Sequence, residues 1–358
     1  MSKVLIIRLS AIGDVAIAIP LCYSLATQYP EDEFVFLSKS KLQPLFKNMP
    51  SNVTFKECDT EGRHSGWKGL VRLYSELRND HFDKIADIHN VLRSTVLRSI
   101  FFWSGKKVAY IHKGRKQKDE LTSMHFKKFV QLKHSMTRYQ EVFEQLGYPV
   151  TLSFSSVIDK ATVDLTPIRN LTGEKSGKWI GIAPFARHTG KIYPLEKMEQ
   201  VLSALSNQQG VTVFLFGGGK KECEILNGWA DKYPNTRSVA GLLIMNSELL
   251  LMSQLDVMLA MDSANMHLAS LVGTPVVSIW GATHPYAGFY GINQDPANAI
   301  QIDLACRPCS IFGNKPCFRH DYACLNSISP ERVIQKVMTV ISAQSQQESL
   351  PRQESPTS

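Results

Sequence analysis

The feature that most constrains this fold is a series of short apolar runs in which hydrophobic and polar residues do not alternate. The first run is KVLIIRL at 3–9. Comparable runs occupy 33–38, 84–88, 178–185, 211–217, 256–261 and 275–281. A strand that is covered on both faces reads as such a run, and this pattern is typical of parallel sheets. Helical patterns lie between most of the runs, so the sequence predicts an α/β fold with parallel sheets.

Length and local composition predict two domains. A chain of 358 residues is long enough for two domains of ordinary size. The stretch 160–177 is polar, rich in turn residues and without apolar periodicity, so it is a natural boundary. We therefore expect an N-terminal α/β domain over 1–165 and a C-terminal α/β domain over 176–328.

The C-terminus carries the signals of a last helix followed by a polar tail. Ser329 is a suitable N-cap and Pro330 suits the first helical position, so we expect a helix over 329–343. The remaining residues, 344–358, are polar and lack apolar periodicity. A disordered tail is therefore expected over 344–358.

Positive charge is concentrated in one part of the chain. The whole sequence has 40 Lys and Arg against 32 Asp and Glu, a surplus of 8. The segment 104–138 alone has ten basic and two acidic residues, so the rest of the chain is neutral. Two interpretations stay open: a solvated face with long side chains, or a surface for an anionic partner such as phosphate, an acidic glycolipid or a membrane.

The N-terminal run does not have the pattern of a secretory or membrane-spanning segment. Arg8 and Asp14 interrupt it and leave no uncharged stretch near the roughly 20 residues that a span needs. We therefore expect a cytoplasmic protein. In that compartment, its seven cysteines are expected to be thiols or metal ligands more often than disulfides.

A single carboxylate, Asp14, lies between the first apolar run and a helix of small residues in RLSAIGDVAIAIP. One interpretation is a helix cap, because acidic side chains accept hydrogen bonds from the first N–H groups of a helix. The other interpretation is a general base, because a carboxylate can take a proton from an attacking hydroxyl. The residue type alone does not decide between them.

Three loops of the second half carry groups that suit a phosphorylated ligand. Asp262 and Ser263 follow a buried run and precede a short helix, whose free N–H groups attract phosphate. The loop APFARHTGKIYP offers a lysine, Lys191, and the loop FGGGKKE offers close backbone approach and Glu222 for ribose hydroxyls. Because the carboxyl ends of parallel strands meet at one edge, these loops are expected to share a site.

Four motifs together resemble glycosyltransferase family 9, the ADP-heptose:lipopolysaccharide heptosyltransferases and their relatives. They are IIRLSAIGDV, APFARHTGKIYP, FGGGKKE and DSANMHLASLVGTPVVSIWGATHP, in the family's order and spacing. The resemblance covers roughly residues 1–340. It implies the GT-B architecture, in which two Rossmann-like domains face a cleft and bind the acceptor and the nucleotide sugar respectively.

The resemblance also implies an activity and its partners. Members of the family are inverting enzymes that use no metal or other cofactor in the chemical step. The expected donor is a nucleotide-diphosphate sugar, by default ADP-heptose. The expected acceptor is the lipopolysaccharide core or a related anionic surface glycolipid, with peripheral contact to the cytoplasmic face of the inner membrane.

Site residues follow from the same resemblance, position by position. Asp14 corresponds to the general base, Lys191 to the residue that neutralises the donor phosphates, and Glu222 to a ribose-binding glutamate. The remaining donor positions, which match the family's DSG–H constellation, are Asp262, Ser263, Ala264 and His267. Ala264 stands where members of the family commonly have glycine, a change that keeps the backbone N–H donor.

Acceptor contacts are expected from two basic stretches. The segment 87–98 resembles the acceptor-facing segment of the family, which makes Arg93 and Arg98 candidates, although an ordinary helix face would explain them equally. Lys113 and Arg115, from the basic segment, are the further candidates for binding an anionic acceptor.

Four cysteines gather within nineteen residues, in CRPCSIFGNKPCFRHDYAC. Cys306 and Cys309 have the spacing of a metal knuckle, whereas Cys317 and Cys324 are more widely spaced than is usual for zinc. A structural zinc or iron site in this 306–324 loop, free buried thiols and disulfides all remain open, and His320 could replace one thiolate.

Two other classes of protein account for less of the sequence. A dinucleotide-dependent oxidoreductase would need a Gly-rich fingerprint, but RLSAIGDV has one glycine where three are expected. A metal-stapled nucleic-acid-binding protein would explain the basic segment, but no nucleic-acid-binding motif is present. We therefore expect a glycosyltransferase that has no nucleic-acid partner.

Overall fold

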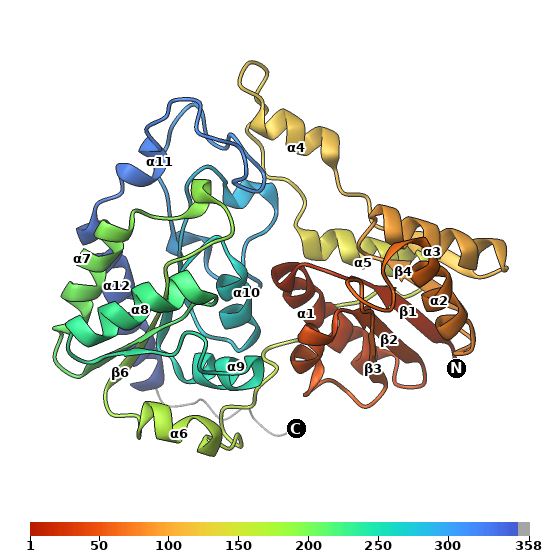
Figure 1. Ribbon diagram of the computed structural model, residues 1–358, viewed down its shortest axis with the longest axis horizontal. Helices are drawn as coiled ribbons and strands as arrows, with labels where there is room; N and C mark the ends of the chain where they lie inside the picture. The colour runs from red at the N-terminus through yellow and green to blue at the C-terminus, as the bar shows by residue number, and fades with distance from the viewer. Residues whose placement is uncertain (350–358) are drawn as a thin grey trace, which may run out of the picture. The chain divides into compact units, whose positions relative to one another are not determined.

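The computed structural model of the protein describes residues 1–349. Over this range the chain divides into two compact α/β units, which are treated separately below (Figure 1). Unit 1 contains residues 1–159 together with the short segment 286–292, and unit 2 contains 160–285 and the residues from 293 onward. The N-terminal domain that we expected over 1–165 did not include this later segment.

Unit 1 is built on a parallel sheet whose strand order, within the described residues, is β3-β2-β1-β4-β5. The strands are β1 (Lys3–Ile7), β2 (Glu33–Ser38), β3 (Val53–Glu57), β4 (Lys84–Asp87) and β5 (Lys107–Tyr110). The central strand β1 pairs Val4 with Phe34 on one side and with Lys84 on the other. The carboxyl ends of β1 and β4 therefore lie next to each other.

Helices cover both faces of this sheet. The helical elements of unit 1 are α1 (Ile12–Gln28), η1 (Ser40–Phe46), α2 (Gly66–Arg78), α3 (Leu92–Trp103), α4 (Arg115–Thr122) and α5 (Ser135–Gln145). Leu5 and Ile7 pack with α2 and α3, while α1 and α5 contact each other and the sheet strands. Val4 and Ile6, which point to the opposite face from Leu5, are equally buried. Burial on both faces explains why the first apolar run does not alternate.

Unit 2 is built on a second parallel sheet, ordered β11-β10-β9-β6-β7-β8 within the described residues. Its strands are β6 (Lys178–Ala183), β7 (Val211–Leu215), β8 (Thr236–Ser238), β9 (Val257–Met261), β10 (Val276–Ile279) and β11 (Ala299–Ile300). Strands β9, β6 and β7 are consecutive neighbours. The α/β fold with parallel sheets that the sequence predicted is therefore confirmed.

The helices of unit 2 again flank the sheet. The α-helices are α6 (Thr166–Thr172), α7 (Leu195–Ser206), α8 (Lys220–Lys232), α9 (Met245–Gln254), α10 (Ala264–Leu271), α11 (Ala323–Asn326) and α12 (Pro330–Ser349). The 3₁₀ turns of unit 2 are η2 (Thr189–Lys191) and η4 (Pro296–Asn298). A further 3₁₀ turn, η3 (Pro285–Ala287), begins at the last residue before the 286–292 segment of unit 1. Apolar side chains of α7, α8 and α12 form one core cluster with the strands. Within residues 1–349, no helix combines the length and the apolarity needed to cross a membrane.

Two expectations about irregular segments need correction. The stretch 160–177 contains a short helix, α6, because Pro167 starts it and Ile168 is buried, and α6 packs against α9. The last helix continues to Ser349, beyond the end that we expected at 343. Residues 344–349 are therefore not a disordered tail, and 350–358 lie outside the described residues.

The irregular segment between β11 and α12 is fixed by one buried arginine. Arg307 donates hydrogen bonds to the carbonyl oxygens of Trp280, Gly281, Thr283 and Ile302 and to Oε1 of Gln301. Its side chain is almost fully buried, so these acceptors would otherwise lie away from water. The guanidinium thus ties the cysteine-rich segment to the loop that follows β10.

We predict that Arg307→Ala destabilises the protein by about 3 kcal/mol, because several buried carbonyl groups lose their donor at once. Urea unfolding followed by circular dichroism measures the change. Arg319→Ala is the matched control, since Arg319 lies in the same segment but is exposed and pairs with Asp321. The control should lose less than about 1 kcal/mol. Equal losses in the two variants would contradict the role assigned to Arg307.

Candidate functional site

Asp14 lies in the first turn of α1, directly after the end of β1. Its Oδ2 accepts a hydrogen bond from the backbone N–H of Ala11 at 3.3 Å and contacts Nη2 of Arg8 at 2.5 Å. The carboxylate is 29% exposed. It therefore caps the helix, as one interpretation expected, and it also remains accessible to a ligand.

Arg8 orients this carboxylate from the end of β1. Its side chain is buried, and Nη1 donates to the carbonyl oxygen of Ile88 at 2.8 Å. The guanidinium also lies 5.9 Å from the centre of the Tyr139 ring on α5. Because three elements of unit 1 hold Arg8, the position of the Asp14 carboxylate is largely fixed.

The loop after β4 is organised by a fully buried carboxylate, Asp87. Its Oδ1 accepts the backbone N–H groups of His89 and Asn90 at 2.9 and 2.7 Å. Its Oδ2 pairs with Nη1 of Arg98 at 2.6 Å, and the Arg98 guanidinium lies 3.9 Å from the Tyr110 ring centre. Arg98, which we expected to contact an acceptor, is thus engaged inside unit 1.

The other arginine expected at the acceptor site is also engaged within unit 1. Arg93 lies in the first turn of α3, and its Nη1 donates to the carbonyl oxygen of His64. The structure therefore gives Arg93 and Arg98 partners within unit 1, and their role at an acceptor site stays a prediction.

His89 is a buried neutral imidazole beside these groups. Its Nδ1 accepts the backbone N–H of Leu9 at 3.3 Å, so the neutral ring carries its proton on Nε2. Burial, followed by repulsion from Arg8 and Lys113, lowers the pKa of His89 to about 3. The ring therefore stays uncharged across the physiological pH range.

Two lysines of the basic segment are partly buried on the same side of unit 1. Burial and repulsion from Arg138 lower the pKa of Lys118 to about 8. Burial and repulsion from Arg8 and Arg115 also lower the pKa of Lys113. Both lysines interact electrostatically with Asp14. Arg115 itself is exposed at the start of α4.

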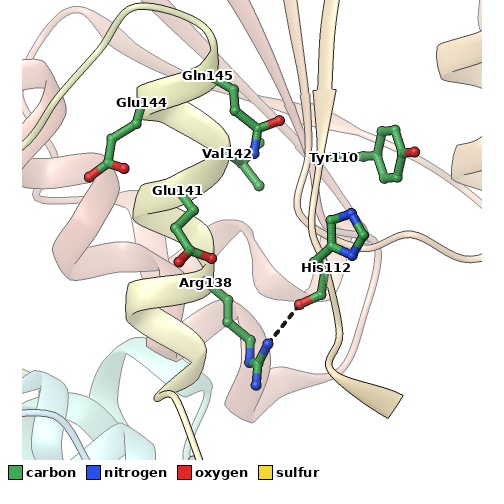
Figure 2. A pocket seen from close by; sticks show the side chains of 7 residues that line it. All are labelled: Tyr110, His112, Arg138, Glu141, Val142, Glu144 and Gln145. Carbon is green, nitrogen blue, oxygen red and sulfur yellow. Dashed lines mark hydrogen bonds between the residues drawn. The ribbon is translucent and has the colours of Figure 1, made fainter. Parts of the chain in front are cut away.

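Unit 1 also has an open cavity of about 370 Å³ between β5 and α5. Figure 2 shows its lining, in which Arg138 donates from Nη1 to the carbonyl oxygen of His112 at 3.0 Å. Its lining residues are Tyr110, His112, Arg138, Glu141, Val142, Glu144 and Gln145. None of the site residues expected from the sequence lines this cavity.

In unit 2, the three loops expected to bind the donor follow neighbouring strands. The loop of Lys191 follows β6, that of Glu222 follows β7 and that of Asp262 follows β9. Lys191 Nζ and Asp262 Oδ2 form an ion pair of 2.9 Å, which joins two of these loops directly. Both side chains are mostly buried. The structure therefore brings this pair together as expected.

The start of α10 presents polar groups close to that ion pair. Ser263 is its N-cap residue and Ala264 its first residue, while His267 is buried one turn later. The Oγ atom of Ser263 is buried without a hydrogen-bond partner among the described residues. A buried hydroxyl and the free N–H groups of a helix start can together receive an anionic group.

Glu222 has an internal partner in its own loop. It lies in the first turn of α8, and its Oε2 accepts the backbone N–H of Gly218 at 2.9 Å. This contact shapes the glycine loop after β7 and leaves the carboxylate at the carboxyl edge of the sheet. Arg187 and Thr189, in the loop after β6, are exposed.

The four clustered cysteines line one narrow cavity of unit 2. Cys306, Cys309, Cys317 and Cys324 are all free thiols, and burial raises the pKa of Cys324 to about 11. The structure therefore contains no disulfide between these four cysteines. Nevertheless, no group of three or more His, Cys, Asp or Glu side chains in residues 1–349 is arranged to hold a metal ion.

The cysteine-rich segment contacts one of the loops expected to bind the donor, the loop that follows β6. The backbone N–H of Cys309 donates to the carbonyl oxygen of Ala282 at 3.1 Å. The backbone N–H of Ala282 in turn donates to the carbonyl oxygen of Gly190 at 2.8 Å. Gly190 is packed so closely that a Cβ atom there would lie 2.8 Å from the carbonyl oxygen of Gly313. This segment therefore supports the turn that carries Lys191.

Comparison with known proteins identifies relatives of the whole arrangement. The family model described as glycosyltransferase family 9 (heptosyltransferase) matches residues 70–314. The lipopolysaccharide core heptosyltransferase OpsX of Haemophilus influenzae is 24% identical over 285 residues, which are 78% of this chain and 79% of the relative. The lipooligosaccharide heptosyltransferase 2 of Campylobacter jejuni is 23% identical over 92% of this chain and 95% of its own length.

The fold is likewise shared with solved structures. The ADP-heptose lipopolysaccharide heptosyltransferase II of E. coli aligns with a TM-score of 0.70 and 18% identity, covering 96% of this chain and 99% of that one. This likeness shows the fold and confirms the expected GT-B class of two Rossmann-like units.

Sequence reasoning missed Arg8 and His89, which lie near Asp14, and Arg138, which lines the cavity of unit 1. Arg8 was noted only as a charge that interrupts the first run, and His89 and Arg138 were not singled out. Arg8 and His89 each follow a buried strand, which is where ligand-binding residues of parallel sheets gather. A position after a buried strand is the sequence signal that could have identified Arg8 and His89. Arg138 lies inside α5, where no such signal marks it.

We predict that His89 makes stability depend on pH. Its pKa is about 3 in the folded protein and about 6.5 when unfolded, so the unfolded chain takes up the proton first as the pH falls. The contribution of neutral His89 to the free energy of unfolding is fully present above about pH 6.5 and is lost as the pH falls towards 3. Between about pH 7 and pH 5, wild type should lose about 2 kcal/mol more unfolding free energy than His89→Gln.

Urea titrations at both pH values provide this measurement. His125→Gln is the control, because His125 is exposed and should leave the pH dependence of wild type intact. If His89→Gln retained the full pH dependence, another group would be responsible.

Proposed function

Since this chain belongs to glycosyltransferase family 9, the heptosyltransferase family, we propose that it transfers heptose from ADP-heptose to the core of a lipopolysaccharide or a related surface glycan. Its curated relatives are named as lipopolysaccharide or lipooligosaccharide heptosyltransferases, and an E. coli structure of the same fold is named for ADP-heptose. The chain spans most of the length of these relatives, which supports a reaction of the same class.

The observation that carries the proposal is the ion pair between Lys191 and Asp262 beside the start of α10. A leaving diphosphate needs cationic and N–H groups that are already in place, because such groups stabilise charge as it develops. Lys191 would contact the diphosphate, with Asp262 holding the lysine in position. Ser263 Oγ and the N–H groups of Ala264 and its neighbours would bind the same phosphates.

Glu222 and His267 complete the proposed donor site. Glu222 would accept hydrogen bonds from ribose hydroxyls, because its carboxylate is held at the carboxyl edge of β7 by Gly218. His267, one turn into α10, would contact the phosphates or the sugar. These contacts hold the donor so that its anomeric carbon is open to attack.

In the proposed reaction, an acceptor hydroxyl attacks the anomeric carbon of the donor. The bond from that carbon to the diphosphate oxygen breaks, ADP leaves, and the configuration at the carbon is inverted. Asp14 takes the proton of the attacking hydroxyl as general base. Arg8 positions the Asp14 carboxylate without taking part in bond changes. No cofactor is needed for these steps.

The proposed acceptor is an anionic glycolipid, which unit 1 would bind. The sequence makes Lys113 and Arg115 candidates for binding the acceptor. Partly buried Lys118 is a further candidate, because its ammonium group, like that of Lys113, interacts electrostatically with Asp14. Burial first, and like-charge crowding second, lowers the pKa values of Lys113 and Lys118, and an anionic ligand would relieve the crowding. Arg93 and Arg98 would contribute only by releasing their present partners. We further propose that the enzyme works at the cytoplasmic face of the inner membrane.

The expectation of a structural metal in the cysteine-rich segment remains a prediction. Elemental analysis of the purified protein should find about one zinc or iron per chain. Cys309→Ser should lose it, whereas Cys223→Ser, outside the cluster, should keep it. Metal-free folded protein with four titratable thiols in this segment would contradict the prediction.

We predict that Asp14→Asn lowers turnover by roughly 10²–10⁴-fold while leaving folding and ADP affinity nearly unchanged. The amide keeps the size and the capping oxygen but cannot take the proton. Release of ADP with a soluble acceptor measures turnover, and thermal stabilisation by ADP measures donor-site binding. Glu33→Gln is the control, because Glu33 is an exposed carboxylate of the same unit that pairs with Lys3. Near-normal turnover of Asp14→Asn would leave Asp14 as a helix cap only.

A further inference from the structure

The loop that follows α4 exposes large apolar side chains. In this 123–130 loop, Phe126 is 85% exposed, Val130 is 56% exposed and Met124 is 48% exposed. Figure 1 shows α4 and the loop after it, in gold, standing apart from the sheet of unit 1. Neither the proposed donor site nor the Asp14 site uses these residues. Apolar groups gathered at one exposed loop mark a surface that contacts another phase or molecule.

The base of this loop is held in place by unit 1. The backbone N–H of Lys128 donates to the carbonyl oxygen of Glu120 at 3.0 Å. The Phe129 ring packs on Tyr286 with a centroid distance of 5.0 Å. The N–H of Phe126 donates to Ser123 Oγ at 3.0 Å. The backbone is thus tethered on both sides of Phe126, while the Phe126 ring remains in solvent.

Basic residues lie in this apolar loop and next to it in the chain, and one of them, Lys128, pairs with Glu120 at 3.1 Å while its side chain stays 66% exposed. Lys127 and Lys128 follow Phe126 directly, and Lys116 is exposed on α4. The wider segment 104–138 has ten basic residues against two acidic ones, which are Asp119 and Glu120. An aromatic ring among lysines matches the interface of an anionic bilayer, where the ring enters the headgroup layer and the lysines meet lipid phosphates.

We propose that the 123–130 loop docks the enzyme on an anionic phospholipid surface by inserting Phe126 between the headgroups. A bilayer is favoured over nucleic acid because the loop also exposes Met124 and Val130, and aliphatic side chains give bases no surface for aromatic stacking. The proposal rests on the proposed function in one respect: a glycolipid acceptor would lie in the same membrane. Lipid binding itself is independent of catalysis.

Co-sedimentation of the full-length protein with vesicles tests the docking. Wild type should bind vesicles of phosphatidylglycerol mixed with phosphatidylcholine, and hardly bind phosphatidylcholine alone. Phe126→Ser should weaken binding to the mixed vesicles by roughly tenfold or more, the effect of removing one buried phenyl ring. The double variant Lys127→Ser/Lys128→Ser should also weaken binding by roughly tenfold, with a smaller salt dependence than wild type.

A matched control separates insertion from general stickiness. Trp67, at the start of α2, is 67% exposed and is followed by Lys68, but it lies outside the 123–130 loop. Trp67→Ser should bind the mixed vesicles as wild type does. Phe126→Trp should retain binding, and its added fluorescence should be quenched by brominated lipid. Loss of binding in Trp67→Ser equal to that in Phe126→Ser would overturn the proposal.

Other outcomes would also overturn it. Absence of wild-type binding to the mixed vesicles, unchanged binding by Phe126→Ser, or preferential retention of single-stranded RNA would each do so. With a short water-soluble acceptor, Phe126→Ser should turn over as wild type does. If no acceptor supports transfer but the vesicle results hold, the proposed function fails while the docking surface stands.

Discussion

Burial of the central strands on both faces is the constraint on which both halves of this protein depend. A parallel strand between two others, covered by helices on each side, has no side chain in water except where it ends. In unit 1, β1 and β4 end at the same edge of the sheet, and Arg8, Asp14 and His89 meet at that edge. In unit 2, β6, β7 and β9 likewise end at one edge, where Lys191 meets Asp262. Polar chemistry is thus confined to strand ends.

The two interpretations of Asp14 turn out to be compatible. The same Oδ2 atom that accepts the Ala11 N–H also pairs with Arg8. A cap fixes the carboxylate relative to α1, and the arginine fixes it relative to the sheet. Such double attachment is what pre-organised chemistry requires, because a loosely held base would have to be ordered in each turnover. Capping therefore supports the proposed role in catalysis.

The sequence predicted the central strands and failed at the edges for a physical reason. Strand β3, VTFKE, lies at the sheet edge and is only partly buried, so its apolar content is low and no run was noticed. The same limit of local sequence patterns applies to the residues of the candidate site. Asp14 and Lys191 can be proposed from the sequence because they lie in recognisable motifs. His89 meets Leu9 through the pairing of β1 with β4, eighty residues apart. Contacts that depend on the order of the strands in the sheet have no signature in the local sequence.

The segment 286–292 has a consequence for how such enzymes can be recombined. It belongs to unit 1 although unit 2 precedes and follows it in the chain. Its backbone accepts the N–H groups of Leu132 and Ser135 through Tyr286 and Gly288. A chimera made by one cut near residue 159 would join residues 1–159 of one parent to another parent's version of this segment. Exchange of the two halves between relatives therefore requires three junctions, and those seven residues must travel with the N-terminal half.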